Sequence, residues 1–189
     1  MSKSKPNVKK YLNFRNVLIL LIFLVVSILW FKYIAGIVLV AAFAPLTVFI
    51  IKCSKMVPHV TADINLAVSC LIGFLYGGFF GLGYGFMTGL FSLVMASHVK
   101  ITSLASVLLA ALSGMLCGFL HSGTHLSFGY AFIIVAILRT IVAWPLFAVL
   151  GTDPFENFTH QTSQLLINLI IYLPLFSLLY SILSTFIGG

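Results

Sequence analysis

The chain has 189 residues, of which 61% are hydrophobic and only 7% are charged, and its mean hydropathy is +1.20. This composition is typical of an integral membrane protein, and it leaves no room for a soluble nucleotide-binding domain or an ATPase. The net charge of +7 does not indicate a nucleic-acid partner, because half of the ten Lys and Arg residues precede the first apolar stretch.

The basic residues at the start of the chain predict its membrane topology. Lys and Arg accumulate on the cytoplasmic side of a membrane, and five of them lie between residues 3 and 15. We therefore expect a multi-pass protein of the cell membrane, with residues 1–16 as a basic cytoplasmic segment and residues 17–189 as a single transmembrane domain. The apolar stretch after Arg15 ends without a small-residue cleavage site, so we expect its helix to be retained rather than removed as a signal peptide.

Two apolar stretches are longer than one membrane span. Residues 17–51 would form a helix of about 52 Å, whereas the hydrocarbon core is about 30 Å thick, so we expect two helices divided near Lys32. A single helix over residues 64–97 would be about 50 Å long, which also exceeds the thickness of the hydrocarbon core. Either one long tilted helix covers them, or the pair Gly77 and Gly78 turns the chain.

Three clearer spans follow at residues 102–120, 127–150 and 163–186. We expect Pro145 and Pro174 to bend the last two, because proline removes a backbone hydrogen bond. The sequence therefore predicts an all-α, polytopic membrane bundle of six transmembrane helices, or of seven if the glycine-rich stretch is broken.

Small residues predict how these helices pack. Glycine recurs at every fourth position over residues 73–89, and a second run of small residues lies between residues 110 and 118. On a helix this spacing produces a strip without side chains, against which another backbone can approach closely. The predicted helix-packing residues are Gly73, Gly77, Gly81, Gly85, Gly89, Ala110, Gly114 and Gly118. The pattern predicts two neighbouring helices, but packing alone does not identify a function.

Arg139 is the first candidate functional residue, because it lies deep within an apolar span. An arginine at the bilayer centre costs about 2.5 kcal/mol or more, so its side chain should face the interior of the bundle and have a partner. Two interpretations are open. Arg139 pairs with Asp153, Glu156 or carbonyl groups of the bent helices, or it contacts an anionic or carbonyl-bearing ligand directly.

Polar side chains of the last span extend this candidate site. Gln164, Asn168 and Tyr172 follow one another at intervals of four residues and therefore share one helix face, which can line a polar cavity. Trp144, on the helix of Arg139, would supply a flat apolar wall. We take these five residues as the predicted substrate-binding residues, with hydrogen bonding between helices as the alternative role of each.

The sequence offers little for metal binding or catalysis. His121 and His125 have the spacing of two zinc ligands on a helix, but Gly123 and the loop context weaken this interpretation, and no glutamate follows the first histidine. The three cysteines are far apart in the sequence and are interpreted as small apolar residues. The sequence lacks a nucleophile elbow, a P-loop and paired intramembrane carboxylates, so we expect no enzyme activity, no metal and no cofactor.

Two passages resemble a known family: IGFLYGGFFGLGYGFMTGLFSLV at residues 72–94 and ITSLASVLLAALSGMLCGFL at residues 101–120. Together with the small size and the near-total membrane burial, they make residues 64–186 similar to the substrate-binding S components of energy-coupling factor vitamin transporters. The resemblance implies a compact helical bundle with a ligand pocket near its outer face. It also implies that the segment TDPFENFTHQ, at residues 152–161, is a loop that closes this pocket.

The resemblance also implies a function. The chain would be a membrane-embedded subunit that captures a small vitamin-like ligand and delivers it together with a transmembrane scaffold subunit and ATPase subunits, in contact with membrane lipid. The alternative is a non-transporting structural membrane protein, such as the cell-shape protein MreD or an accessory subunit of a larger membrane complex. A polar pocket would favour transport, whereas a filled interior and an exposed small-residue face would favour a structural role.

Overall fold

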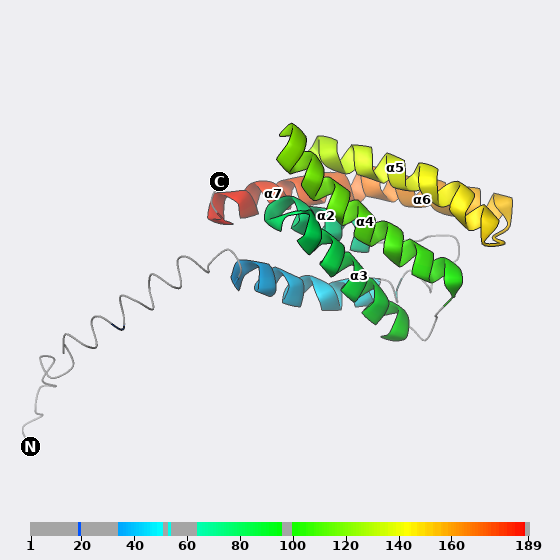
Figure 1. The fold of residues 1–189 in the computed structure, drawn as a ribbon, viewed down its shortest axis with the longest axis horizontal. Coiled ribbons are helices and arrows are strands. Elements are labelled where there is room, and N and C mark those ends of the chain that lie inside the picture. Colours follow the sequence, from blue (N-terminus) through cyan, green and yellow to red (C-terminus); the bar gives the residue numbers. More distant parts are fainter. Residues whose placement is uncertain (1–18, 20–33, 51–52, 54–63, 96–99, 188–189) are drawn as a thin grey trace, which may run out of the picture.

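The computed structural model describes residues 19, 34–50, 53, 64–95 and 100–187, and every regular element in this part of the chain is helical (Figure 1). In chain order the helices are Ile34–Ile50, α2 at Ile64–Tyr76, α3 at Gly78–Met95, α4 at Ile101–Thr124, α5 at Phe128–Val149, α6 at Pro154–Ile167, the π-helical segment η2 at Asn168–Tyr172, and α7 at Leu173–Ile187.

Four helices of this part are long and apolar enough to cross a membrane, namely α3, α4, α5 and the continuous helix Pro154–Thr185. The protein is therefore an all-helical membrane protein. The basic segment at residues 1–16 and the expected division near Lys32 lie outside the described residues.

Helix α2 lies at the centre of the bundle. Every residue from Ile64 to Phe74 is buried, and α2 contacts α3, α4, α5 and α7. Aromatic rings of α5 and α7 complete this core, and Phe128, Phe132 and Phe176 are almost fully buried in it. The 13 residues of α2 span only about 20 Å, so α2 is too short to cross a hydrocarbon core of about 30 Å alone.

Gly77 separates α2 from α3 and decides between the two arrangements left open for residues 64–97. Its φ of +106° lies in the left-handed region that favours glycine. The two helices then fold back on each other, since a Cβ added to Gly81 would lie 2.7 Å from the Cα of Gly73. The glycine-rich stretch is thus a helical hairpin and not one long helix, and its five regularly spaced glycines do not share a single helix face.

Small residues allow the backbones of α2, α3 and α4 to come into direct contact. A Cβ added to Gly81 would lie 2.7 Å from the carbonyl oxygen of Gly114, and one added to Gly114 would lie 2.8 Å from the carbonyl oxygens of Gly81 and Ser69. A Cβ added to Gly85 would lie 2.8 Å from the Cα of Ala111. These distances are too short for carbon atoms, so side chains at these positions would separate the helices.

Of the remaining predicted packing residues, all but one lie at the contact of α2, α3 and α4, and one lies in the turn between α2 and α3. Gly118 approaches the backbone of Gly78, Gly89 faces a side chain of α4, and Ala110 is 1% exposed. Gly77 differs, because it is exposed in the turn and a Cβ there would meet no atom within 4 Å. Its role is conformational, whereas the others permit close approach.

Helix α6 begins at Pro154, where the sequence led us to expect a loop. The Asp153 carboxylate accepts hydrogen bonds from the backbone N–H groups of Phe155 at 2.9 Å and Glu156 at 3.1 Å, which caps the helix. Proline fits this first turn because its missing N–H has no partner within a helix there. Most of residues 152–161 is therefore helical, and the expectation of a closing loop is wrong.

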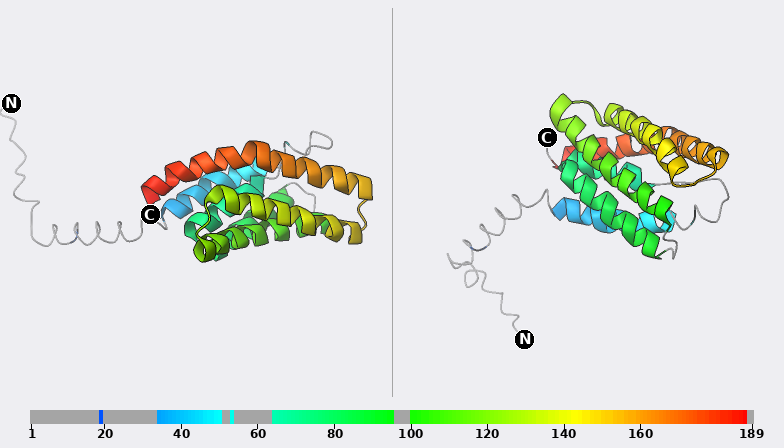
Figure 2. Two further views of the ribbon diagram at one scale, coloured as in Figure 1. Left: turned by 90° about the horizontal axis from the view of Figure 1, so that it is seen from above. Right: turned by 45° about the vertical axis from the view of Figure 1, so that its right-hand side comes forward.

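The segments α6, η2 and α7 form one continuous, gently curved helix along the length of the bundle (Figure 2). The π-helical segment ends with a hydrogen bond from the Leu173 N–H to the Asn168 carbonyl oxygen, immediately before Pro174. Pro174 has no N–H to donate, and the wider turn ahead of it accommodates the missing hydrogen bond. The last helix thus begins at Pro154, and not at residue 163.

Candidate functional site

A buried polar stripe runs along α6 and η2. Its members are Asn157, Gln161, Gln164, Asn168 and Tyr172, which follow at intervals of three or four residues and are at most 6% exposed. Large apolar side chains on the opposite face of the same helix are at least half exposed. The helix therefore turns its polar side inward and its apolar side outward, as a helix surrounded by lipid does.

Helix α5 packs beside α6 and runs in the opposite direction (Figure 1). The side-chain Nδ2 of Asn157 donates a hydrogen bond to the backbone oxygen of Trp144 on α5 at 2.8 Å. Because both helices rise by the same distance per residue, this pairing places Arg139 at the level of Gln161 and Gln164. Arg139 thus lies at the depth of the part of the polar stripe around Gln161 and Gln164.

Arg139 is 4% exposed, and its Nη2 donates a hydrogen bond to the Oγ of Ser106 on α4 at 3.2 Å. The acidic residues considered as its partners, Asp153 and Glu156, are both exposed, and the Asp153 carboxylate caps α6. A guanidinium carries five N–H donors in a planar fork, so it can bind Ser106 and an anionic group at the same time.

Gln161 has no hydrogen-bond partner for either atom of its amide group among the described residues, although the side chain is only 2% exposed. The Oδ1 atoms of Asn157 and Asn168 are also buried without a partner in that part of the chain. Each unsatisfied buried polar group costs about 1–3 kcal/mol. A bound molecule with complementary donors and acceptors would remove this cost.

The predicted substrate-binding residues that are buried on α5, α6 and η2 are Arg139, Gln164, Asn168 and Tyr172. Trp144 lies differently. The residue is 51% exposed, and its indole packs against the ring of Phe158, with centroids 5.8 Å apart. Trp144 therefore contributes its backbone oxygen to the site, and its side chain is not a wall of the polar stripe.

Three further residues belong to the site, namely Asn157, Gln161 and Ser106. Asn157 and Gln161 precede Gln164 by seven and three residues, and this spacing on one helix face is a signal in the sequence. Because the sequence leads us to expect a loop at residues 152–161, this helical spacing is not recognised as a signal. Ser106 lies on another helix, and its contact with the arginine has no signature in the sequence.

The two histidines of the HSGTH motif contribute to helix packing and to the end of α4. His121 stacks on Phe74 with ring centroids 4.0 Å apart, and His125 terminates α4 with a φ of 53°. Cys70 and Cys117 are free thiols and fully buried. Among the residues that the structure describes, no three His, Cys, Asp or Glu side chains lie close enough together to hold a metal ion.

No protein-family model, curated protein or solved structure matches the chain. The buried polar stripe and Arg139 are the features of the structure that bear on function. Amides and a guanidinium in a buried position can bind a small molecule through hydrogen bonds and charge, without covalent chemistry.

Proposed function

We propose that the protein is the solute-binding subunit of a transporter of the energy-coupling factor type. In this proposal it crosses the cell membrane several times, keeps residues 1–16 in the cytoplasm, and captures a small vitamin-like ligand for ATP-driven uptake. A transmembrane scaffold subunit and ATPase subunits would be its partners, because the sequence contains no P-loop of its own. The observation that carries the proposal is the buried polar stripe at the level of Arg139.

The chemistry of the stripe favours a small polar ligand with one anionic or carbonyl group. The amide of Gln161 offers both a donor and an acceptor, and the Oδ1 of Asn168 offers an acceptor. The guanidinium of Arg139 would bind a carboxylate, phosphate or carbonyl oxygen, most strongly through two parallel hydrogen bonds. These interactions are stronger in a membrane interior than at a surface, because water does not compete for them.

A structural role is the second candidate, and the packing of α2, α3 and α4 supports it. Backbone fills the interior at Gly73, Gly81 and Gly114, as it would in a scaffold of the MreD kind or in an accessory subunit. A purely structural bundle, however, would be more stable with apolar side chains at Gln161 and Asn168, whose buried polar atoms lack partners among the described residues. The polar stripe therefore favours ligand binding.

The substitution Gln161→Leu separates these two functions. It removes both unpartnered amide atoms at similar side-chain volume, so the ligand-free protein should gain about 1 kcal/mol or more of stability. Ligand binding should weaken at the same time. Mass spectrometry of extracts from purified protein should show a small molecule bound to the wild type, and at least about tenfold less of it per folded Gln161→Leu molecule.

Thr162→Ala is the matched control, because Thr162 is the next residue of α6 and is exposed. Its ligand content and melting temperature should equal those of the wild type. If Gln161→Leu lowers the melting temperature, and neither it nor the wild type carries a small molecule, Gln161 is structural and the transport proposal is refuted.

A further inference from the structure

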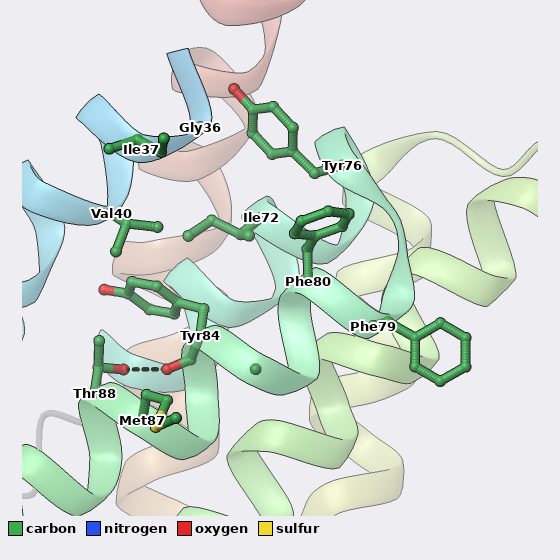
Figure 3. A pocket seen from close by; sticks show the side chains of 11 residues that line it. Gly36, Ile37, Val40, Ile72, Tyr76, Phe79, Phe80, Tyr84, Met87 and Thr88 are labelled. Atoms are coloured by element: carbon green, nitrogen blue, oxygen red, sulfur yellow. Dashed lines mark hydrogen bonds between the residues drawn. The ribbon is translucent and has the colours of Figure 1, made fainter. Parts of the chain in front are cut away.

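A cavity of about 500 Å³ lies between the helix Ile34–Ile50, the end of α2, and α3 (Figure 3). Ile37 lines it from the first of these helices, Tyr76 from the end of α2, and Phe80 and Tyr84 from α3. No residue of the polar stripe is among the described residues that line it. Its volume is within the range of roughly 300–1,000 Å³ that is usual for small-ligand sites.

The lining consists of hydrocarbon and aromatic surface, and the described lining residues include no charged side chain. The Tyr84 hydroxyl lies 3.2 Å from the Thr47 hydroxyl. The Thr88 hydroxyl lies 2.6 Å from the Tyr84 carbonyl oxygen (Figure 3). It also lies 2.8 Å from the Oδ1 of Asn65. The Tyr84 and Thr88 hydroxyl groups thus already bind the protein, whereas the buried Tyr76 hydroxyl has no partner among the described residues. With one such hydroxyl group in an otherwise apolar lining, the cavity suits an apolar occupant.

The rim of the cavity continues into an exposed apolar surface. Ile37, Phe79 and Met87 line the cavity and are 68%, 72% and 70% exposed, respectively. On a membrane protein such side chains face acyl chains. Water is poorly held in an apolar cavity that offers it few polar partners, and an empty cavity loses the dispersion contacts of its lining. A hydrocarbon chain that enters from the bilayer would restore these contacts.

We propose that this cavity binds one acyl chain of a membrane phospholipid. The headgroup stays outside, because the described lining residues offer no charge to bind it. The bound chain contacts the helix Ile34–Ile50 on one side and the hairpin of α2 and α3 on the other. This site is independent of the solute-binding site, so its test does not depend on the proposed function.

Gly83 is the position at which the cavity can be filled. It lines the cavity, and a Cβ added there would meet no atom within 4 Å, so Gly83→Leu fills the space without displacing a helix. Gly123 provides the matched control. A Cβ added to Gly123 would also meet no atom within 4 Å, and Gly123 lies near the end of α4, outside the cavity lining.

The experiment uses the full-length chain in phosphatidylcholine vesicles that contain a small fraction of phosphatidylcholine with a diazirine on its acyl chain. After irradiation, peptide mass spectrometry locates the crosslinked residues. We expect crosslinks at Ile72 and Tyr84, which line the cavity and are only 3% and 5% exposed, in the wild type and in Gly123→Leu, and about tenfold fewer in Gly83→Leu. Gly83→Ala fills less of the cavity and should reduce them by about twofold.

Equal crosslinking in wild type and in folded, monodisperse Gly83→Leu would show that lipid only surrounds the protein, and would overturn the proposal. The proposal also fails if the wild type shows no lipid crosslinks at Ile72 and Tyr84. If Gly83→Leu does not fold, Gly83→Ala and Gly123→Ala are compared, and equal yields overturn the proposal.

Discussion

At the residue scale, Arg139 is a charge buried inside the bundle. Its guanidinium donates to the Ser106 hydroxyl of α4 at 3.2 Å. A charge at the bilayer centre costs about 2.5 kcal/mol or more, which favours a location inside the bundle and near polar groups. The planar fork of donors distinguishes arginine from lysine at such a site, because it binds a carboxylate in two parallel hydrogen bonds.

Arg139→Lys should therefore preserve the fold and weaken ligand binding. Lysine keeps the positive charge but loses the planar fork, so we expect affinity per folded molecule to fall by about tenfold or more. Ligand content relative to folded protein measures this effect, with gel filtration and circular dichroism as checks of folding. If Arg139→Lys and Arg139→Ala both lose stability, and ligand content follows the folded fraction, the role of Arg139 is structural.

At the scale of elements, the α2–α3 hairpin and α4 form a unit held together by backbone contacts. Interior glycines would each cost a helix about 0.8–1 kcal/mol relative to alanine in water. In lipid, unpaired backbone groups are so unfavourable that the helices persist despite their glycines. The glycines can then serve close packing, as the contacts of Gly73 and Gly81 with Gly114 show.

Gly81→Leu tests whether the stability of this unit depends on close backbone contact. The new side chain would meet the backbone of Gly114 and Gly73, and overpacking of this kind costs about 1–3 kcal/mol or more. We expect a clearly lower melting temperature in detergent, whereas Leu82→Met at the next position should be tolerated. Equal melting temperatures for the two variants would show that the hairpin does not depend on close backbone contact.

At the scale of the whole molecule, charge and hydropathy orient the bundle in the membrane. The net charge of +7 is concentrated before the first apolar stretch, and the described helices present apolar side chains outward. This distribution favours insertion with the basic segment in the cytoplasm. The solute-binding proposal depends on this orientation, because uptake requires a ligand site that is reached from outside.

Cysteine labelling tests the orientation. Ser4→Cys in a Cys53→Ser background should remain unlabelled by a membrane-impermeant maleimide in intact cells and become labelled after permeabilisation. Background labelling should be low, because Cys70 and Cys117 are fully buried. Labelling of Ser4→Cys before permeabilisation would reverse the proposed topology.

The helical class and several helix bounds follow from the sequence by itself. The spans expected at residues 102–120 and 127–150 correspond to α4 at Ile101–Thr124 and α5 at Phe128–Val149. Apolar segments of this length form their backbone hydrogen bonds internally, so local composition is sufficient to predict them. The polar residues of the candidate site are also visible in the sequence, because a charge or an amide within an apolar span is rare.

Only the tertiary structure decided where the glycine-rich stretch turns and which polar residues are buried together. A continuous helix and a hairpin at Gly77 both agree with the local pattern, and the choice depends on packing between Gly73 and Gly114, which are distant in the sequence. The burial of Asn157 and Gln161 likewise requires α5 to lie beside α6. Local hydrogen bonding determines that a segment is a helix, whereas the neighbour of each face depends on contacts between distant segments.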